Sequence, residues 1–323
     1  MRRPLVGLTA TALVLSAATA CGSSQSSDTS GASEKGGSTT VKVGVIPIVD
    51  VAPIYLGKEK GFYSKRGIEL DLVTAQGGAA IVPGVVSGQF GFGFSNTTSL
   101  MIAQTKNVPV KGVANGVAST GKEGADFGGV VVKKDSSIKD AADLAGKKVA
   151  VNTLNNIGDT SVRESVRKAG GDPKEVKFVE MAFDQMPAAL DNGQVDAAWV
   201  VEPVLATAKA AGDRVVASNF VDVAPDLTVA LYFTSTQFAQ KNPDLVKEFK
   251  EATDESLAYA NSHPDEVREI LSTYTKIPAA TLSAITLPSW PTEPNRASLE
   301  TLAELGRTDG VLTTAPDLDK LLP

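Results

Sequence analysis

The 323-residue chain has one cysteine, one histidine and no block of basic residues. Because Cys21 and His263 are the single residues of their types, a disulfide within the chain is impossible. A metal site built from two Cys or His ligands is excluded for the same reason. The formal net charge of -6 also disfavours a nucleic-acid partner. The sequence therefore predicts no metal, no cofactor and no nucleic-acid partner, and we expect a monomer.

Long apolar runs are missing after the first twenty residues, so no later segment is typical of a transmembrane helix. Arg2 and Arg3 precede an apolar stretch that ends in small residues, as in a secretory signal peptide. The sequence LSAATAC closes this stretch on Cys21 and resembles the lipobox of bacterial lipoproteins. The resemblance implies that residues 1–20 are a lipoprotein signal peptide and that Cys21 carries a lipid anchor. The alternative is an ordinary secretory signal with a cysteine just past the cleavage site.

Hydrophobic residues are scarce immediately after Cys21. Residues 22–40 consist almost entirely of Gly, Ser, Thr and charged residues. Such a segment buries too little apolar surface to order itself. We therefore expect a flexible tether over residues 21–40 and a folded body that begins at residue 41, outside the cytoplasm.

From residue 41 the chain alternates short apolar runs with helical periods, which is typical of α/β folds. The pattern then repeats, because KKVAV at 147 matches VKVGV at 41, EVKFV at 175 matches ELDLV at 69, and NGQVDAAWVV at 192 matches SGQFGFGFSN at 87. Three matches in order at nearly constant spacing predict two lobes built on one plan.

The expected domain limits follow from this repeat. Lobe one comprises residues 41–128 and 235–323, and lobe two comprises residues 129–234. Predicted strands at 129–133 and 226–235 cross between the lobes and form a hinge with a cleft. The mostly helical segment after residue 235 is expected to pack on lobe one, because lobe two is already closed by its own repeat.

Ligands of open α/β sheets bind beyond the carboxyl ends of the strands. The segments there, 47–52, 74–79 and 95–99 in lobe one and 152–160, 180–186 and 200–203 in lobe two, are rich in Asn, Thr, Ser, Gln, Gly and Asp. None of these segments contains Lys, Arg, Cys or His. The predicted site is therefore polar and lacks basic side chains.

The run FGFGFSNTTSL, residues 90–100, carries the strongest signal of this kind. Hydroxyl and amide groups at a strand end lie beside the free N–H groups of the next helix and can hold a ligand's oxygen atoms. Each residue alone is better explained as an N-cap. One cap needs only one such residue, however, and this run supplies five polar residues in a row. Lobe two has a similar surplus of polar side chains in Asn152, Asn155 and Asn156.

The acidic and aromatic residues of these segments have separate interpretations. Asp50 and Glu202 are expected to accept hydrogen bonds from an amine, amide or hydroxyl group of the ligand. Asp159 has a competing explanation as a helix cap. Phe183 and Trp199 offer flat apolar walls, although an aromatic residue of this kind more often belongs to the core. The candidate ligand-binding residues are Asp50, Val51, Gln76, Gly78, Ser95, Asn96, Thr97, Asn152, Asn155, Asn156, Asp159, Phe183, Trp199 and Glu202.

The runs VKVGVIPIVDVAPIYLGKEKGFYSKRGIELDLV, IVPGVVSGQFGFGFSN, SSIKDAADLAGKKVAV and ALDNGQVDAAWVVEPVL resemble the solute-binding proteins of sulfonate, nitrate and taurine importers. The same superfamily includes binders of thiamine pyrimidine precursors. The resemblance implies a type II periplasmic-binding fold that closes on a small molecule and delivers it to an ABC transporter permease. It places ligand contacts in the segments named above and in a W-E-P turn, which appears here as WVVEP with two inserted residues.

The ligand expected from these residues is sulfonate-, carboxylate- or pyrimidine-like. One alternative is an enzyme of the pyrimidine-synthesis branch of the superfamily. The sequence disfavours it because a nucleophile needs an adjacent base, and the single histidine lies in NSHPDE, outside the predicted site. The other alternative is a sensor that presents its ligand to a membrane receptor, and the sequence does not separate it from an importer component.

Overall fold

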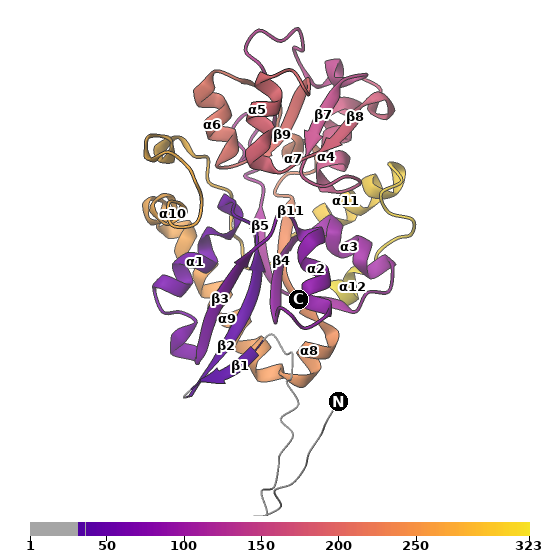
Figure 1. Cartoon of the computed structure of the whole chain (residues 1–323). Coiled ribbons are helices and arrows are strands. Elements are labelled where there is room, and N and C mark those ends of the chain that lie inside the picture. The colour runs from indigo at the N-terminus through magenta and orange to yellow at the C-terminus, as the bar shows by residue number, and fades with distance from the viewer. Residues whose placement is uncertain (1–31, 36) are drawn as a thin grey trace, which may run out of the picture.

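A computed structural model describes residues 32–35 and 37–323. The predicted signal peptide, Cys21 and the first part of the predicted tether lie outside the described residues. The described chain forms two α/β lobes, each built around one sheet (Figure 1). The α/β class and the two-lobe plan expected from the internal repeat are confirmed.

The first sheet contains β1 (Ala32–Lys35), β2 (Ser38–Val45), β3 (Ile68–Thr74), β4 (Phe92–Asn96), β5 (Val110–Ala118) and β11 (Thr228–Ser235). The second contains β6 (Gly128–Val132), β7 (Lys148–Val151), β8 (Lys177–Glu180), β9 (Ala197–Val201) and β10 (Arg214–Ala217). In both sheets the strands that precede a crossover helix run parallel to one another, as β2 does with β3 and β4 and as β7 does with β8 and β9.

Two predicted boundaries differ from the structure. Residues 32–35 and 38–40, expected in the tether, instead form β1 and the start of β2, which pair as a hairpin. Thr39 and Thr40 favour extended backbone and also pair with β3, so long-range pairing orders a polar segment that composition assigns to coil. In addition, β11 lies between β4 and β5 in the first sheet, so lobe two ends before Thr228 and not at residue 234.

The helices follow the strands as the crossovers require. They are α1 (Ala52–Glu59), α2 (Gly78–Val86), α3 (Thr97–Thr105), α4 (Ile157–Lys168), α5 (Met186–Asp191), α6 (Val204–Ala211), α7 (Asn219–Val223), α8 (Thr236–Lys241), α9 (Pro243–Ser262), α10 (Pro264–Leu271), α11 (Arg296–Thr308) and α12 (Leu318–Leu321). Short 3-10 turns are η1 (Val49–Val51), η2 (Ser64–Arg66), η3 (Ala141–Leu144), η4 (Pro173–Glu175), η5 (Phe183–Gln185) and η6 (Ala279–Ala284). Since α2, α3 and α4 start where β3, β4 and β7 end, their N-termini lie at the carboxyl ends of the sheets.

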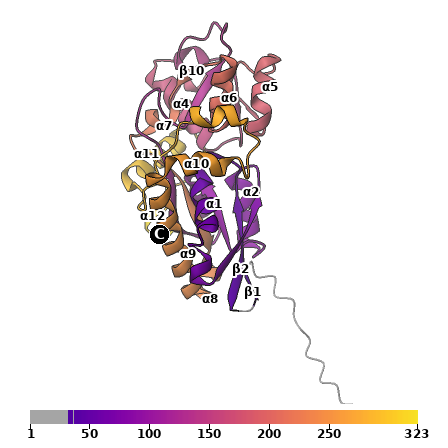
Figure 2. The ribbon, with the colours of Figure 1, turned by 90° about the vertical axis from the view of Figure 1, so that its left-hand side faces the viewer.

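The chain passes between the lobes twice, through residues 119–127 after β5 and residues 224–227 before β11. The C-terminal helices then pack mainly on lobe one, as predicted (Figures 1 and 2). Helix α9 lies against α1 and β5, and its Phe249 stacks on Phe92 of β4 with ring centroids 3.8 Å apart. Helix α11 also contacts α4 and α7, so the C-terminal segment touches both lobes.

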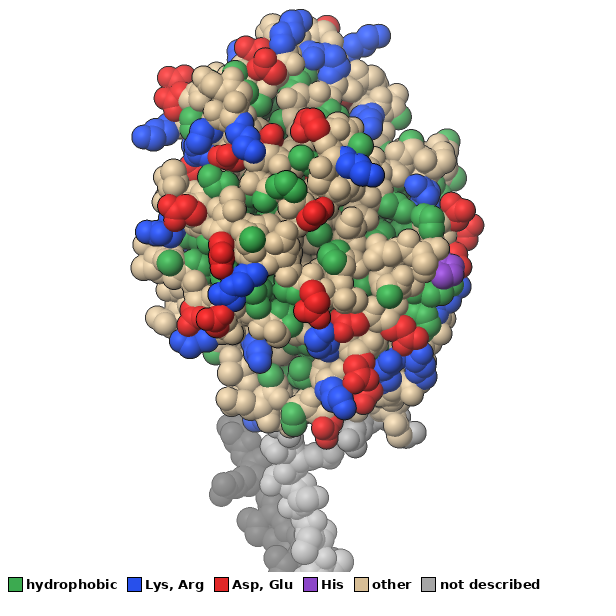
Figure 3. Space-filling model, turned by 180° about the vertical axis from the view of Figure 1, so that it is seen from behind, with side chains coloured by type: hydrophobic (Ala, Val, Ile, Leu, Met, Phe, Trp, Pro, Cys, Tyr) green, Lys and Arg blue, Asp and Glu red, His purple; other side chains and the backbone are tan. Residues whose placement is uncertain are grey.

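Charged side chains of both signs are interspersed over the face seen in Figure 3, without a patch of one sign. Between residues 32 and 323, leaving out residue 36, no helix is both long and apolar enough to cross a bilayer.

The contact of α1 with α9 requires a glycine. A Cβ atom added at Gly57 would lie 1.9 Å from the Ser256 Oγ and 2.9 Å from the Tyr63 ring. Ser256 is fully buried and donates its hydroxyl hydrogen to the Ala252 carbonyl, so it has no room to move away. The close approach of these two helices fixes the C-terminal segment on lobe one.

We expect Gly57→Ala to lower the free energy of unfolding by about 1–3 kcal/mol, because overpacking forces the helices apart. Urea denaturation measures the change. Lys58→Ala on the exposed face of the same helix is the control and should change stability by less than about 0.5 kcal/mol. An equal effect of the two variants would contradict the assigned role of Gly57.

Candidate functional site

The polar residues predicted from the sequence surround the N-termini of three helices at the junction between the lobes. Asn96 caps α3, since its Oδ1 accepts the Ser99 N–H at 2.8 Å. Asn156 caps α4, since its Oδ1 accepts the Ile157 N–H at 2.9 Å. Both asparagines therefore act as N-caps. For the α3 start this is the role that the alternative interpretation gave to single residues of the run 90–100, whereas Asn156, and not Asp159, caps α4.

The same region also joins the lobes directly. The Asn156 side chain donates from Nδ2 to the Ser99 Oγ at 3.0 Å, which links α4 of lobe two to α3 of lobe one. Nearby, the Asn152 Nδ2 lies 3.5 Å from the Gln76 carbonyl oxygen, a long contact. The structure thus brings together the polar segments that follow β3, β4 and β7, which belong to different lobes.

Several predicted site residues are buried inside lobe one. Ser95 is fully buried against Gly78, where an added Cβ would lie 2.1 Å from the Ser95 Oγ. The Thr97 hydroxyl donates to the carbonyls of Thr228 and Val229 at 3.3 Å each. These residues and the buried Val51 shape the strand ends from within the lobe. By contrast, Gln76 and Asn155 are exposed, and Asn96, Asn152 and Phe183 are half-buried.

Aromatic residues lie behind the N-terminus of α4. Trp199 of β9 makes edge-to-face contacts with Phe183 and Phe220, with centroids 5.4 and 5.8 Å apart. Trp199 is buried, and its Nε1 has no acceptor among the residues that the structure describes. Phe183 is the member of this group that reaches the surface.

Asp159 lies in the first turn of α4 and is buried. Its Oδ2 accepts the Asn155 N–H at 2.6 Å, while its Oδ1 has no partner within the described part of the chain. Burial raises the pKa of Asp159 to about 6, against the lowering effects of the Asn155 hydrogen bond and the Arg163 charge. Asn155 adopts the left-handed region, with φ of 52°, to make this bond.

Asp50 lies on η1 at the side of the junction nearest the crossing segments. The side chain is 3% exposed, and its Oδ1 is unpartnered among the described residues. Burial raises the pKa of Asp50 to about 7, and the nearby charge of Asp126 raises it further. The neighbouring Val49 N–H donates to the Glu202 carbonyl of lobe two, so the segment that carries Asp50 lies between the lobes.

Glu202 is fully buried, and backbone groups engage both of its oxygens. Its Oε2 accepts the Ala206 N–H at 2.8 Å, and its Oε1 accepts the Thr286 N–H at 3.0 Å. Burial also raises the pKa of Glu202 to about 7. The carboxylate thus holds two chain segments in place, an arrangement that leaves it fewer acceptor sites for a ligand.

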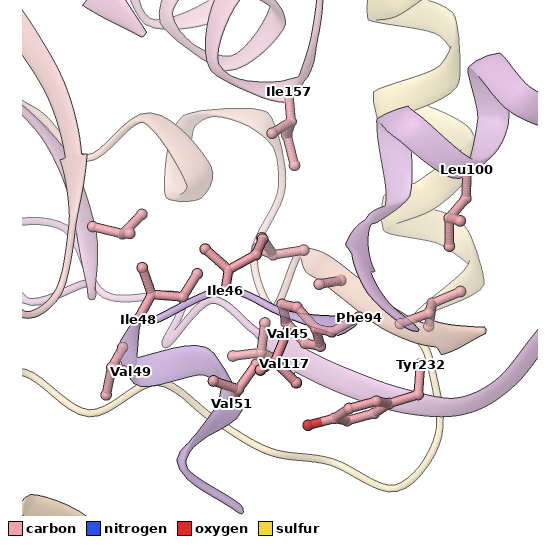
Figure 4. Packing of buried hydrophobic residues seen from close by; sticks show 14 of the residues in the cluster. Val45, Ile46, Ile48, Val49, Val51, Phe94, Leu100, Val117, Ile157 and Tyr232 are labelled. Atoms are coloured by element: carbon pink, nitrogen blue, oxygen red, sulfur yellow. The ribbon is translucent and has the colours of Figure 1, made fainter. Parts of the chain in front are cut away.

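Sequence reasoning missed an apolar contact between the lobes. Ile157 of α4 points down toward Ile46, which follows β2, and all the labelled side chains belong to one continuous cluster (Figure 4). Sequence reasoning also assigned no position to Trp290. In the structure Trp290 is buried, and its Nε1 donates to the Asp50 carbonyl at 3.0 Å. These contacts join residues far apart in the chain, so only the periodic burial of apolar residues could have signalled them.

Within residues 32–35 and 37–323, no group of three His, Cys, Asp or Glu side chains is placed to hold a metal ion. His263 lies where α9 meets α10, with its ring stacked on Tyr259 at 3.7 Å.

A family model described as NMT1/THI5 like matches residues 48–267, more than half of the chain. The taurine-binding periplasmic protein of Escherichia coli (strain K12) is 27% identical over 205 residues, which are 63% of this chain and 61% of that protein. The 4-amino-5-hydroxymethyl-2-methylpyrimidine phosphate synthase of Aspergillus parasiticus is 24% identical over 227 residues, 66% of this chain and 64% of the enzyme. The chain thus matches less than two thirds of the length of both relatives.

Among solved structures, the alkanesulfonate-binding protein SsuA of Xanthomonas axonopodis pv. citri, bound to MOPS, is similar with a TM-score of 0.75. The match covers 88% of this chain and 98% of that chain at 16% sequence identity. The likeness confirms the expected periplasmic-binding-protein fold.

The raised pKa of Asp159 predicts a pH-dependent stability. A carboxyl whose pKa is raised in the folded state stabilises it most below the unfolded value of 3.8 and loses that contribution as pH rises through 6. We expect Asp159→Asn to flatten the pH dependence of the unfolding free energy between pH 4 and 7 by roughly 1–3 kcal/mol.

Urea denaturation at several pH values checks this expectation. Val162→Ala, a cavity-forming change on the same helix, should destabilise the protein equally at every pH. An Asp159→Asn profile parallel to the wild-type profile would show that this carboxyl is not the source of the dependence.

Proposed function

The chain belongs to the NMT1/THI5-like family, and on that premise we propose that it is an extracytoplasmic substrate-binding protein. It closes on a small organic ligand and delivers the ligand to the permease of an ABC importer. The observation that carries this proposal is the meeting of two polar strand-end regions from separate lobes, through Asn156 with Ser99 and Asn152 with Gln76. A ligand bound there contacts both lobes and stabilises the closed arrangement.

The proposed ligand contacts are the polar and aromatic side chains that reach this junction without a full set of internal partners. Gln76, Asn152 and Asn155 present amide groups, and Phe183 presents a ring. Asp50 and Trp199 contribute buried polar atoms that no described residue satisfies. A further set supports these contacts through capping and packing: Val51, Gly78, Ser95, Asn96, Thr97, Asn156, Asp159 and Glu202.

The chemistry of the junction favours an oxygen-bearing ligand that also donates hydrogen bonds. The N-termini of α2, α3 and α4 supply partial positive charge for a sulfonate or carboxylate group without a basic side chain. Asp50 is suited to an amine, amide or hydroxyl donor. The proposed ligand class is therefore sulfonate-, carboxylate- or pyrimidine-like. The name of the taurine-binding relative and the MOPS bound to the solved sulfonate-binding protein support the sulfonate option.

An enzymatic role is the second candidate because one relative is a pyrimidine phosphate synthase. We rank it lower. The single histidine of the chain is engaged with Tyr259 and Ser262 at the α9–α10 junction, in lobe one. Chemical conversion of a bound pyrimidine by the purified protein would reverse the ranking.

We further propose that the protein acts as a monomer held to the membrane by a lipid on Cys21. Full-length protein produced in a bacterial host should partition into the detergent phase of a Triton X-114 extraction. The Cys21→Ser variant should move to the aqueous phase. Equal partitioning of the two would contradict lipidation at this cysteine.

A thermal-shift screen of alkanesulfonates, taurine, MOPS, small carboxylates and aminopyrimidines tests the binding function. A compound at a hundredfold excess over its dissociation constant stabilises the folded state by about 2.7 kcal/mol, a shift of several degrees. Absence of a shift with every class would contradict the proposed ligand chemistry.

For a compound that binds, we expect Asn155→Ala to weaken affinity by roughly tenfold, about the free energy of one hydrogen bond, as measured by calorimetry. Asn107→Ala is the matched control and should bind normally, because Asn107 is also exposed and also has a positive φ, of 58°, but is not a proposed ligand contact. Equal affinities would remove Asn155 from the site.

A further inference from the structure

Residues 286–291, which we name the strap, lie between η6 and α11 and cross the junction of the lobes. On the lobe-one side, Ser289 exchanges two backbone hydrogen bonds with Ala118 at the end of β5, at 2.9 and 3.1 Å. Trp290 is buried and donates from Nε1 to the Asp50 carbonyl. Its backbone is held from the other side by both polar atoms of the Asn261 side chain. The strap is thus anchored to lobe one at several points.

The first residue of the strap reaches lobe two. The Thr286 N–H donates to Glu202 at 3.0 Å. Glu202 is part of lobe two, because its own N–H donates to the Phe127 carbonyl at 2.8 Å and its other carboxylate oxygen accepts the Ala206 N–H. A second bond runs from the Val49 N–H to the Glu202 carbonyl at 3.0 Å. One residue therefore joins lobe two to the strap and to η1.

The location of these bonds gives them a mechanical role. The covalent crossings occupy residues 119–127 and 224–227, and Glu202 pairs with the end of the first of them. We propose that the strap is a noncovalent link between the lobes beside the two covalent crossings, and that Glu202 is the positioning residue that makes this link open more readily as pH rises.

The burial of Glu202 determines whether the link opens more or less readily as pH rises. The Glu202 carboxyl is fully buried, and burial raises its pKa from the ordinary value of 4.5 to about 7. The charge that acts on Glu202 is that of Lys209 of α6, which lowers the pKa of the carboxyl. Two further carboxyls belong to the segments bonded to the Glu202 backbone: Asp50 follows Val49, and Asp126 precedes Phe127. Separation of the strap from Glu202 breaks the Thr286 hydrogen bond, which lowers the pKa, but it also admits water. Because burial is the larger of the two effects, the pKa of the opened carboxyl returns toward its ordinary value. Because the closed link binds the proton more tightly, opening becomes more favourable between pH 5.5 and 8.

Hydrogen exchange of the full chain, without ligand, tests the proposal. Peptides containing Thr286 should show an opening equilibrium that rises by roughly tenfold between pH 5.5 and 8, after correction for the intrinsic exchange rate. Peptides from the middle of α9 serve as the internal reference. The measurement needs no ligand, so a ligand screen without hits would not affect the strap proposal. A flat exchange profile, in turn, would not affect the binding proposal.

Two variants separate the proton linkage from simple loosening. Glu202→Gln should reduce the pH dependence of the opening of the Thr286 peptide to less than half of the wild-type dependence. Trp290→Phe removes the indole donor but no carboxylate, so it should increase opening at every pH and keep the wild-type dependence. If Glu202→Gln does not fold, the pH profiles of the wild type and of Trp290→Phe test the proposal, which requires the same rise of the opening equilibrium with pH in both. A flat wild-type profile, or an unchanged profile in Glu202→Gln, overturns the proposal.

Discussion

The free N–H groups at the N-termini of α2, α3 and α4 must find partners where the carboxyl ends of two sheets face each other, and this requirement organises the junction. Asn96 and Asn156 meet part of it as caps. Because Asn156 also donates to Ser99 in the other lobe, a capping residue becomes an inter-lobe contact. The many polar acceptors of the region follow from the same requirement, since helix N-termini need acceptors. The oxygen atoms of a small ligand would use the same N–H donors.

Three buried carboxylates near the junction differ in how many backbone N–H groups they accept. Asp159 accepts a backbone N–H beside the N-terminus of α4, Asp50 keeps an unpartnered oxygen, and Glu202 is engaged on both oxygens. Burial is the largest cause of the raised pKa in each case, so desolvation outweighs the hydrogen bonds that favour the charged forms. Similar chemistry therefore yields different roles, and the number of protein donors that reach each carboxylate distinguishes them.

Local patterns in the sequence predicted much of the fold and the position of the junction. The repeat predicted two lobes, and the polar runs after the strands predicted which segments meet, because strand ends and helix starts are encoded within a few residues. The errors arose where distant partners decide. Residues 38–40 form a strand because β3 lies beside them, and β11 joins the first sheet because β4 and β5 flank it. The double engagement of Glu202 depends on Thr286, which is 84 residues away and has no local signature.

The segment after β2 connects the two halves of the junction. Ile46 faces Ile157 across the lobes (Figure 4), the Val49 N–H donates to Glu202, and the Asp50 carbonyl accepts from Trp290. A ligand that contacts Asp50 therefore binds a segment whose backbone is already tied to the strap and to lobe two. Such a coupling is reciprocal. If opening of the strap changes the ligand affinity by some factor, then ligand binding changes the opening equilibrium of the strap by the same factor. In the proposed function, ligand binding at Asp50 and opening of the strap are therefore coupled through backbone hydrogen bonds on one short segment.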